Sequence, residues 1–212
     1  MIGDMASAKE RARRKFDRWA GSYERDRRSR LNARPQQEAL KALSLQPADR
    51  FLDVGCGTGA AVREAAATVA RAVGLDISEG MVARAGELAA DVPGTEFFVG
   101  DSERLPFPDA AFTAVLCTAS FHHYPDPAQA LAEMARVLTS DGRLVIADGT
   151  ADLRVARIVD WFLRHFDRSH VRLYRTSEMA ALLARSGFAD LRVRYLFDGG
   201  YAILHARRTT GG

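Results

Sequence analysis

The 212-residue sequence has only two cysteines, Cys56 and Cys117. Two thiols cannot build a disulfide framework or a four-cysteine zinc site, so both are expected to be reduced and no metal site is predicted. No stretch approaches the roughly 18 uninterrupted apolar residues of a membrane span, and the first residues lack the apolar segment of a signal peptide. These absences predict a cytoplasmic protein without membrane insertion.

The sequence also has little excess charge of either sign, because its formal net charge is only +3. A net charge this small does not by itself indicate that the protein binds nucleic acid. The lysines and arginines gather in residues 7–30, a helical segment in which Phe16, Trp19 and Tyr23 share one face. We interpret the basic face as solvated and the aromatic stripe as packing. A site for an anionic substrate or RNA is the alternative.

A glycine-rich loop follows a short apolar run in residues 51–59, FLDVGCGTG. Gly55, Gly57 and Gly59 alternate in a turn without Cβ atoms, and a helical, alanine-rich stretch continues over 60–69. This strand, loop and helix bring bare backbone and a helix start to a polar ligand at the carboxyl edge of a parallel sheet. The dinucleotide fingerprint G-x-G-x-x-G looks similar, but here the glycine spacing differs and Asp53 precedes the loop.

Strands and helices alternate after this loop. Strands are predicted at 69–75, 95–99, 111–116 and 144–147, and helices at 78–90 and 128–138, with a turn at 140–142. This alternation predicts an α/β fold with a doubly wound, mostly parallel sheet and helices on both faces. Asp76 then lies at the strand end beside the glycine loop, where a carboxylate can accept hydrogen bonds from ribose hydroxyls. A capping role for Asp76 is the alternative.

The flanking segments are predicted to be helical at 36–45, before Pro47, and at 152–166. In the latter, Val155, Ile158, Val159, Phe162 and Phe166 share one face, which we interpret as core packing, with a lid over the substrate as the alternative. Ser177 is expected to cap a helix that ends at Arg185 before Gly187. Two antiparallel strands, 191–196 and 201–207, should complete the chain.

Six ordered blocks resemble the class I S-adenosylmethionine-dependent methyltransferases, within which the chain is similar to the small-molecule branch that includes the ubiquinone/menaquinone-biosynthesis type. They read FLDVGCGTG, GLDISEGMV, FFVGDSERLPF, AFTAVLCTASFHHYPDP, EMARVLTSDGRLVIAD and SEMAALLARSGF, and the resemblance covers about residues 12–205. It implies a Rossmann-like sheet of seven strands with an antiparallel C-terminal strand. The stretch 139–142 departs from the usual Pro-Gly-Gly, which affects only a structural turn.

The resemblance also implies S-adenosylmethionine as cofactor and assigns residues to it. The implied contacts are Asp53, Gly55, Cys56, Gly57 and Gly59 to the methionine part, Asp76 to the ribose, Ile77 and Met81 to adenine, Asp101 and Ser102 to the adenine amino group, and Cys117 at the border between cofactor and substrate. One domain, 1–212, is expected, with an N-terminal helical lid (1–46), a cofactor-binding core (47–148), a helical substrate-lid segment (149–176) and a C-terminal helix and hairpin (177–212).

The acceptor is expected to be a small molecule. His122 and His123 are candidates for a general base because an imidazole titrates near neutral pH, although both could simply pack the loop. Candidate substrate-binding residues are Phe16, Trp19, Tyr23, His170 and Arg172. The sequence leaves open O-, N- or C-methylation, and a monomer or a homodimer. An RNA-directed methyltransferase and a non-catalytic S-adenosylmethionine-binding protein are the alternatives.

Overall fold

The computed structural model describes residues 2–167 and 169–209, which form one sheet covered by helices. The helices are α1 (Ile2–Trp19), α2 (Arg27–Leu43), α3 (Ala60–Ala66), α4 (Glu79–Leu88), α5 (Pro127–Val137), α6 (Arg154–Phe166) and α7 (Thr176–Arg185), with short 3-10 turns η1 (Tyr23–Arg25), η2 (Phe121–His123) and η3 (Phe197–Gly199). The strands are β1 (Arg50–Val54), β2 (Arg71–Asp76), β3 (Thr95–Val99), β4 (Phe112–Thr118), β5 (Leu138–Gly149), β6 (Phe188–Leu196) and β7 (Tyr201–Arg208).

The sheet has seven strands in the order β3-β2-β1-β4-β5-β7-β6. Strands β1 to β5 pair in parallel, whereas β7 is antiparallel to both β5 and β6. The predicted doubly wound sheet with an antiparallel C-terminal strand is therefore confirmed. Because the chain reverses its winding between β1 and β4, a crevice opens at the carboxyl ends of these two strands.

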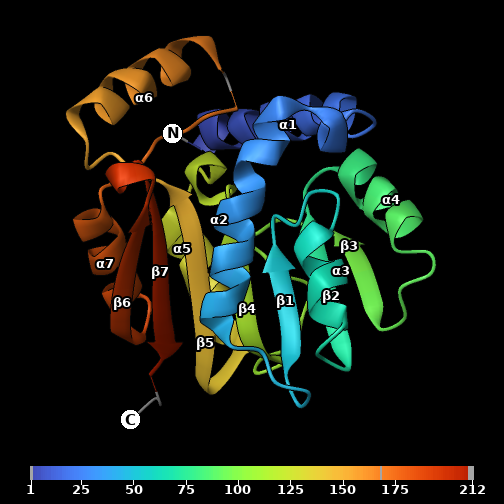
Figure 1. The fold of residues 1–212 in the computed structure, drawn as a ribbon. Helices are drawn as coiled ribbons and strands as arrows, with labels where there is room; N and C mark the ends of the chain where they lie inside the picture. Colours follow the sequence, from blue (N-terminus) through green and yellow to red (C-terminus); the bar gives the residue numbers. More distant parts are fainter. Residues whose placement is uncertain (1, 168, 210–212) are drawn as a thin grey trace.

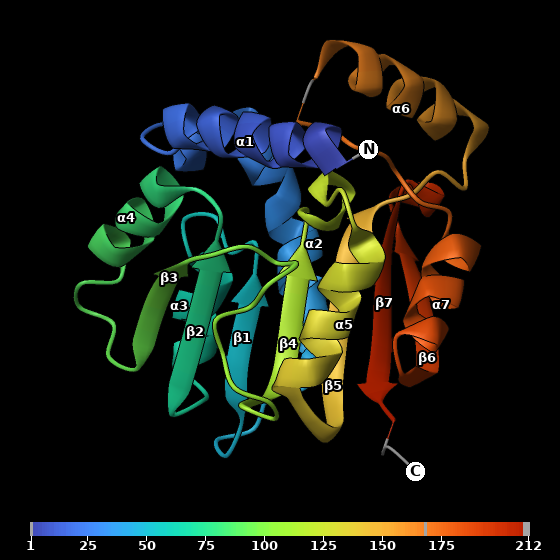
Figure 2. The same ribbon diagram turned by 180° about the vertical axis from the view of Figure 1, so that it is seen from behind.

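The two faces of the sheet are buried under different helices. Neighbouring residues of β1 alternate between the faces, so Phe51 packs with α2 and α3 while Leu52 packs with α5 and α7. Figures 1 and 2 show α2 and α3 on one face and α5 on the other, with α1 lying across the carboxyl edge of the parallel strands. Helix α1 thus covers the crevice where a ligand site is expected.

The N-terminal helices differ from the prediction. The single segment expected over 7–30 is broken after Trp19 by a turn and η1, and α2 begins at Arg27 rather than at 36. Pro35 lies inside α2, where it removes one backbone hydrogen bond. The helix continues because Ala39, Leu40 and Leu43 bury its inner face against the sheet. Packing therefore overrides the local signal of the proline.

Two further predicted boundaries are wrong. Strand β5 begins at Leu138, directly after α5, and the expected turn at 140–142 is a bulge in which Asp141 has a φ of 60°. Helix α7 begins at Thr176, with Arg175 at the cap position, and the Arg175 N–H donates to the Glu178 carboxylate at 2.9 Å. Ser177 therefore lies within the first turn and does not cap the helix.

Helix α6 does not contribute its apolar face to the core. Val155, Ile158, Val159, Phe162 and Phe166 are all exposed, so the expectation of core packing is wrong. In Figures 1 and 2 the helix projects beside α1 above the sheet. Within the described ranges, no helix is both long enough and apolar enough to cross a membrane.

Candidate active site at the carboxyl edge of the sheet

A cavity of about 320 Å³ lies at the carboxyl ends of β1, β2 and β4, beneath α1. Its floor comes from the glycine loop at 55–58, from Asp76, Ile77 and Met81, and from the segments at 100–103 and 118–120. The first turns of α2, together with α1 and η1, supply the roof. Segments far apart in sequence thus meet at one edge of the sheet, because β3, β2, β1 and β4 are parallel neighbours whose carboxyl ends lie side by side.

The glycine loop holds three residues in the left-handed region. Gly55, Gly57 and Gly59 have φ angles of 78°, 52° and 77°. A Cβ at Gly55 would lie 2.0 Å from Ser120 Oγ, whereas the nearest atom to a Cβ at Gly57 is 4.0 Å away, in Tyr23. Gly57 therefore leaves open space and a free approach to its backbone, while Gly55 is required by close packing. Gly59 contributes to the turn but does not line the cavity.

Asp76 ties the loop to the next strand. It is buried, and its carboxylate accepts hydrogen bonds from the backbone N–H groups of Gly57 and Ser78, both at 2.9 Å. Burial raises the pKa of Asp76, and these two donors oppose that rise by stabilising the charge. Asp76 lines the cavity and places its carboxyl group at the floor.

Asp53 lies deeper than the cavity surface. Its side chain is fully buried, and neither carboxyl oxygen has a hydrogen-bond partner among the described residues. Burial, reinforced by the negative charge of Asp76, raises the pKa of Asp53 to about 8. Asp53 is therefore protonated at neutral pH, as expected for a fully buried carboxyl beside a second one.

The acid after β3 is already paired with the roof. Lys9 Nζ on α1 lies 2.6 Å from Asp101 Oδ2 and also contacts the Glu103 carboxylate. Both acids and Ser102 between them line the cavity. The pKa of Lys9 is raised because these hydrogen bonds and charges outweigh its partial burial, which alone would lower it. One α1 side chain thus closes this end of the cavity.

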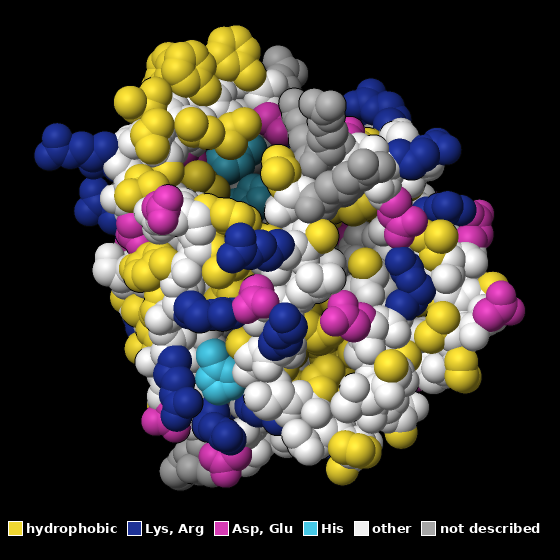
Figure 3. Space-filling model, viewed as in Figure 1, with side chains coloured by type: hydrophobic (Ala, Val, Ile, Leu, Met, Phe, Trp, Pro, Cys, Tyr) yellow, Lys and Arg dark blue, Asp and Glu magenta, His cyan; other side chains and the backbone are white. Residues whose placement is uncertain are grey.

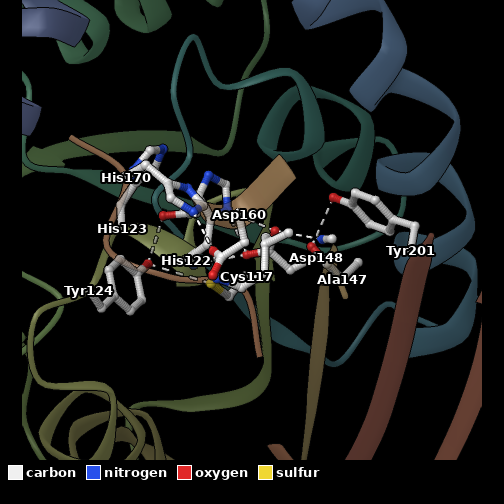
Figure 4. A network of polar contacts seen from close by, with 12 residues as sticks. Cys117, His122, His123, Tyr124, Ala147, Asp148, Asp160, His170 and Tyr201 are labelled. Atoms are coloured by element: carbon white, nitrogen blue, oxygen red, sulfur yellow. Dashed lines mark hydrogen bonds and ion pairs between the residues drawn. The ribbon is translucent and has the colours of Figure 1, made fainter. Parts of the chain in front are cut away.

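The two neighbouring histidines have different surroundings. His123 lines the cavity, and its Nδ1 lies 2.6 Å from the Ser169 carbonyl, which can only accept; the Nε2 atom of the neutral ring is therefore unprotonated. Burial and then the neighbouring His122 hold the pKa of His123 well below its usual value. His122 is outside the cavity lining, and its Nδ1 lies 2.8 Å from Asp148 (Figure 4).

Several predicted site residues are not brought to the cavity. His170 is buried with its Nε2 2.7 Å from Asp160 (Figure 4), and Arg172 pairs with Glu178 at 2.7 Å. Trp19 packs on the rings of Phe16 and Tyr23 and donates its Nε1–H to Asp26 at 3.1 Å, whereas Phe16 and Tyr23 themselves line the roof. Cys117 is buried against the Tyr124 hydroxyl, which lines the cavity in its place.

Sequence reasoning missed several residues at or beside the cavity, including Lys9, Asp17 and Asp148. Lys9 and Asp17 lie in the charged N-terminal segment, where nothing in their spacing separates them from the solvated residues around them. Asp148 lies near the carboxyl end of β5, directly after the strand predicted at 144–147, and an acid at a strand end was a usable signal for it. Within the described ranges, no group of three or more His, Cys, Asp or Glu side chains could hold a metal ion.

Comparisons with known proteins agree with this architecture. Residues 52–146 match a family model described as a methyltransferase domain. An uncharacterized methyltransferase of Bacillus subtilis is 33% identical over 156 residues, which cover 71% of this chain and 61% of that protein. The crystal structure of that protein superposes with a TM-score of 0.74 at 22% identity, covering 84% of this chain and 99% of the crystallised one.

Two relatives carry specific names. A demethylmenaquinone methyltransferase of Mycolicibacterium vanbaalenii is 33% identical over 186 residues, covering 78% of this chain and 79% of that protein. The 27-O-demethylrifamycin SV methyltransferase of Amycolatopsis mediterranei is 43% identical over 110 residues, covering 50% of this chain and 40% of that protein. The chain thus spans only part of some relatives. It belongs to the class I S-adenosylmethionine-dependent methyltransferases.

Proposed function

We propose that this protein transfers a methyl group from S-adenosylmethionine to a small-molecule acceptor in the cavity beneath α1. One observation carries the proposal: carboxylates at two successive strand ends, Asp76 and Asp101, face the same cavity as the open glycine loop. Such an arrangement offers acceptors to hydroxyl and amino groups along an extended polar ligand, with bare backbone at one end.

The residues present fit the cofactor. The cavity volume, about 320 Å³, is at the lower end of the roughly 300–1,000 Å³ of small-molecule sites. Asp76 would hold the ribose hydroxyls, Ile77 and Met81 would flank adenine, and Asp101 with Ser102 would accept from its amino group. The backbone at Gly57, where a Cβ would meet open space, would receive the methionine part.

Bound S-adenosylmethionine supplies a methyl group on a sulfonium, which needs positioning more than covalent help. Holding the reactants in line in a dry site lowers the barrier by up to roughly 7–11 kcal/mol. Phe16 and Tyr23 in the roof would exclude water and place aromatic rings near the positive charge. His123, with Nε2 free, is the better-placed base for an acceptor that loses a proton.

A small acceptor agrees with the volume of the cavity, about 320 Å³, and with its roof of α1, η1 and α2 residues. Relatives named for a menaquinone precursor and for a rifamycin precursor support the same class. In the same proposal, residues 1–46 act as a lid and 47–148 as the cofactor-binding core. An RNA acceptor and a non-catalytic binding protein remain the alternatives to be tested.

Isothermal titration calorimetry tests cofactor binding. We expect micromolar binding of both S-adenosylmethionine and S-adenosylhomocysteine, and none of a nicotinamide dinucleotide. Incubation with a fractionated cell extract, followed by mass spectrometry for S-adenosylhomocysteine, then tests transfer. Binding without any product from small-molecule fractions, but with product from RNA, would contradict the small-molecule acceptor.

A further inference from the structure

Three histidines from two separate segments gather beside the cavity. His122 and His123 lie in η2 with their ring centroids 4.0 Å apart, and the ring of His170 lies 5.3 Å from that of His122. Figure 3 shows histidine side chains recessed below the apolar side chains over α6. His123 lines the cavity, whereas His122 and His170 are not part of its lining. Of the three rings, His123 is therefore the one whose orientation bears on chemistry in the cavity.

The backbone of Ser169 decides which nitrogen of His123 carries the hydrogen. Nδ1 lies 2.6 Å from the Ser169 carbonyl oxygen, which can only accept, so the hydrogen of the neutral ring is on Nδ1. The Nε2 atom is left with a lone pair that can take up a proton. The ring is held in this tautomer as firmly as the Ser169 carbonyl itself is held.

Lys15 of α1 holds Ser169 in place. Its Nζ atom lies 2.9 Å from the Ser169 Oγ and 2.5 Å from the Asp167 Oδ2. The Asp167 Oδ1 accepts from the Ser169 N–H at 3.1 Å and from its hydroxyl at 2.6 Å. Burial would raise the pKa of Asp167, but hydrogen bonds from Lys15 and Ser169 hold it well below its usual value. The ionised carboxylate and the ammonium group thus clamp Ser169 between them.

The next residue of α1 touches the ring of His123 itself. The ring of Phe16 lies 5.2 Å from that of His123 at an angle of 78°, an edge-to-face contact. On the other side, the His122 carbonyl accepts from the backbone N–H groups of residues 171 and 172 at 3.0 and 3.2 Å. The segment that Lys15 holds is therefore joined to both α1 and η2, with His123 between them.

We propose that Lys15 is a positioning residue for His123. Through the turn of Asp167 and Ser169 it holds the imidazole in the tautomer whose Nε2 accepts a proton. The inference rests on the proposed function, in which His123 takes the proton of the acceptor. It adds that the helix which roofs the cavity also prepares the base, so that the base is competent where α1 is in place.

A purely structural role for Lys15 makes a different prediction. Lys15 would then only fasten α1, and its loss would lower the melting temperature without changing the histidine. As a positioning residue, Lys15 also affects the protonation of His123. The charged and titratable groups that face His123 are Lys15 from α1, His122 from η2, and Asp167 and His170 from the segment after α6.

These neighbours have opposing effects. Burial, then His122, and also Lys15 lower the pKa of His123, whereas the Ser169 carbonyl and Asp167 raise it. Removing the charge of Lys15 leaves Asp167 unopposed by a neighbouring ammonium group. The pKa of His123 should therefore rise in a variant that lacks this charge.

Nuclear magnetic resonance of the full chain with ¹⁵N-labelled histidine tests the proposal without a methyl acceptor. The sequence has five histidines, and the spectrum of His123→Gln identifies the signals of His123. At about pH 8 the wild-type ring should be neutral, with its hydrogen on Nδ1. In Lys15→Met, which keeps most of the stem but loses the charge and the donors, the Nδ1 and Nε2 signals should move toward each other as the tautomers mix. The titration of His123 should also move to higher pH.

Two further variants serve as controls. Arg14→Met makes a similar change on the same helix at an exposed position, and its spectrum should match the wild type. Lys15→Arg keeps a charge and several donors and should retain the wild-type tautomer. Calorimetry with S-adenosylhomocysteine shows that each variant is folded, because neither position lines the cavity. Once an acceptor is identified, Lys15→Met should lower kcat about tenfold with little change in the KM for S-adenosylmethionine.

A wild-type His123 with its hydrogen on Nε2 would overturn the proposal. So would an unchanged tautomer in Lys15→Met, even with a lower melting temperature, because Lys15 would then only fasten α1. An equal change in Arg14→Met would also overturn it, by showing that any loss of charge on α1 has this effect. Failure of the wild-type chain to bind S-adenosylmethionine would instead refute the proposed function, and the histidine spectra would still show whether Lys15 holds the ring.

Discussion

Asp53 and Asp76 are neighbouring carboxyls with opposite surroundings. Asp76 accepts two backbone hydrogen bonds that favour its ionised form, whereas Asp53 has no hydrogen-bond partner among the described residues and its pKa is raised to about 8. The sequence pattern predicts both as cofactor residues but cannot separate their protonation. That difference arises from which backbone N–H groups the folded loop turns toward each side chain.

Asp76→Ala should weaken binding of S-adenosylhomocysteine about 10–100-fold, because one or two hydrogen bonds to a charged group contribute about 1.5–3 kcal/mol each. Its melting temperature should also fall, since Gly57 and Ser78 lose their acceptor. Titration calorimetry and thermal unfolding measure the two effects, with the exposed Asp91→Ala as control. Unchanged affinity would leave Asp76 with the capping role alone.

Asp53 should make the ligand-free protein less stable at alkaline pH. Its pKa is about 8 when folded and near 3.9 when unfolded, so the folded state holds a proton that the unfolded state loses. This contribution is complete below pH about 3.9 and is lost as pH rises through about 8. Asp53→Asn cannot ionise and should flatten the decline in unfolding free energy between pH 6 and 8, measured in urea; an unchanged slope would argue against a protonated Asp53.

His123→Ala should lower turnover by about 10²–10⁴-fold if His123 takes the acceptor's proton. The low pKa of His123 places the acid limb of the rate profile below pH 6.5. His122→Ala removes a neighbour that lowers this pKa, so the limb should move to higher pH while most activity is kept. Equal losses in both variants with unshifted profiles would show that neither histidine is the base.

At the scale of elements, α1 is fastened over the cavity at three separated places. Lys9 contacts Asp101 and Glu103, Lys15 contacts Asp167, and Asp17 accepts from the Ser78 hydroxyl and the Gly80 N–H. The Asp17 contact places an α1 carboxylate at the beginning of α4, where it also favours the helix dipole. These contacts support the proposed role of α1 as a lid.

Asp17→Ala should release S-adenosylhomocysteine about tenfold faster, since two charge-assisted hydrogen bonds of the lid are lost. Stopped-flow displacement of the bound ligand measures this rate. Arg14→Ala is the matched control, because Arg14 is exposed on the same helix and its ion pair among the described residues is with Glu10 of α1 itself. If both variants release ligand at the wild-type rate, α1 does not limit exchange.

Strands were easier to predict than the helices above them. Buried strands such as β4 are continuous apolar runs, so they can be recognised from the sequence without knowing which helices pack on them. The break at 20–26 had no comparable signal beyond Gly21. It depends on contacts such as Glu24 with Arg63, which join segments far apart in sequence. The face of α6 was misread because its spacing is identical whether core, lipid or solvent covers it.

For the whole molecule, acid should destabilise the fold. Burial lowers the pKa of His123, His170 and His205 below the unfolded value of about 6.5, so the unfolded chain takes up protons first as pH falls. Their stabilising contribution is present above pH 6.5 and is lost progressively below it. Because Asp53 changes stability in the opposite direction over this pH range, the test uses the Asp53→Asn variant. Its urea midpoint should be lower at pH 5.5 than at pH 7, and a higher midpoint at pH 5.5 would contradict this.

The site was predictable where the sheet alone positions it. Asp76 ends β2 and Asp101 lies just after β3. The carboxyl ends of these parallel strands meet at one edge of the sheet, whatever conformation the loops adopt. His170 and Arg172 lie in a segment whose path is decided by contacts with α6 and α7, so their distance from the cavity could not be read from spacing. The position of Lys9 could not be predicted either, because its contacts with Asp101 and Glu103 join residues far apart in the sequence.

The antiparallel direction of β7 decides where a fused partner would sit. β7 runs away from the edge that α1 covers, and Figures 1 and 2 show the beginning of α1 and the end of β7 at opposite edges of the sheet. A tag or sensor surface joined after β7 would therefore leave the cavity roof and α6 unobstructed. Joined before α1, the same tag would crowd both, so instruments that immobilise the protein should hold it by its C-terminal side.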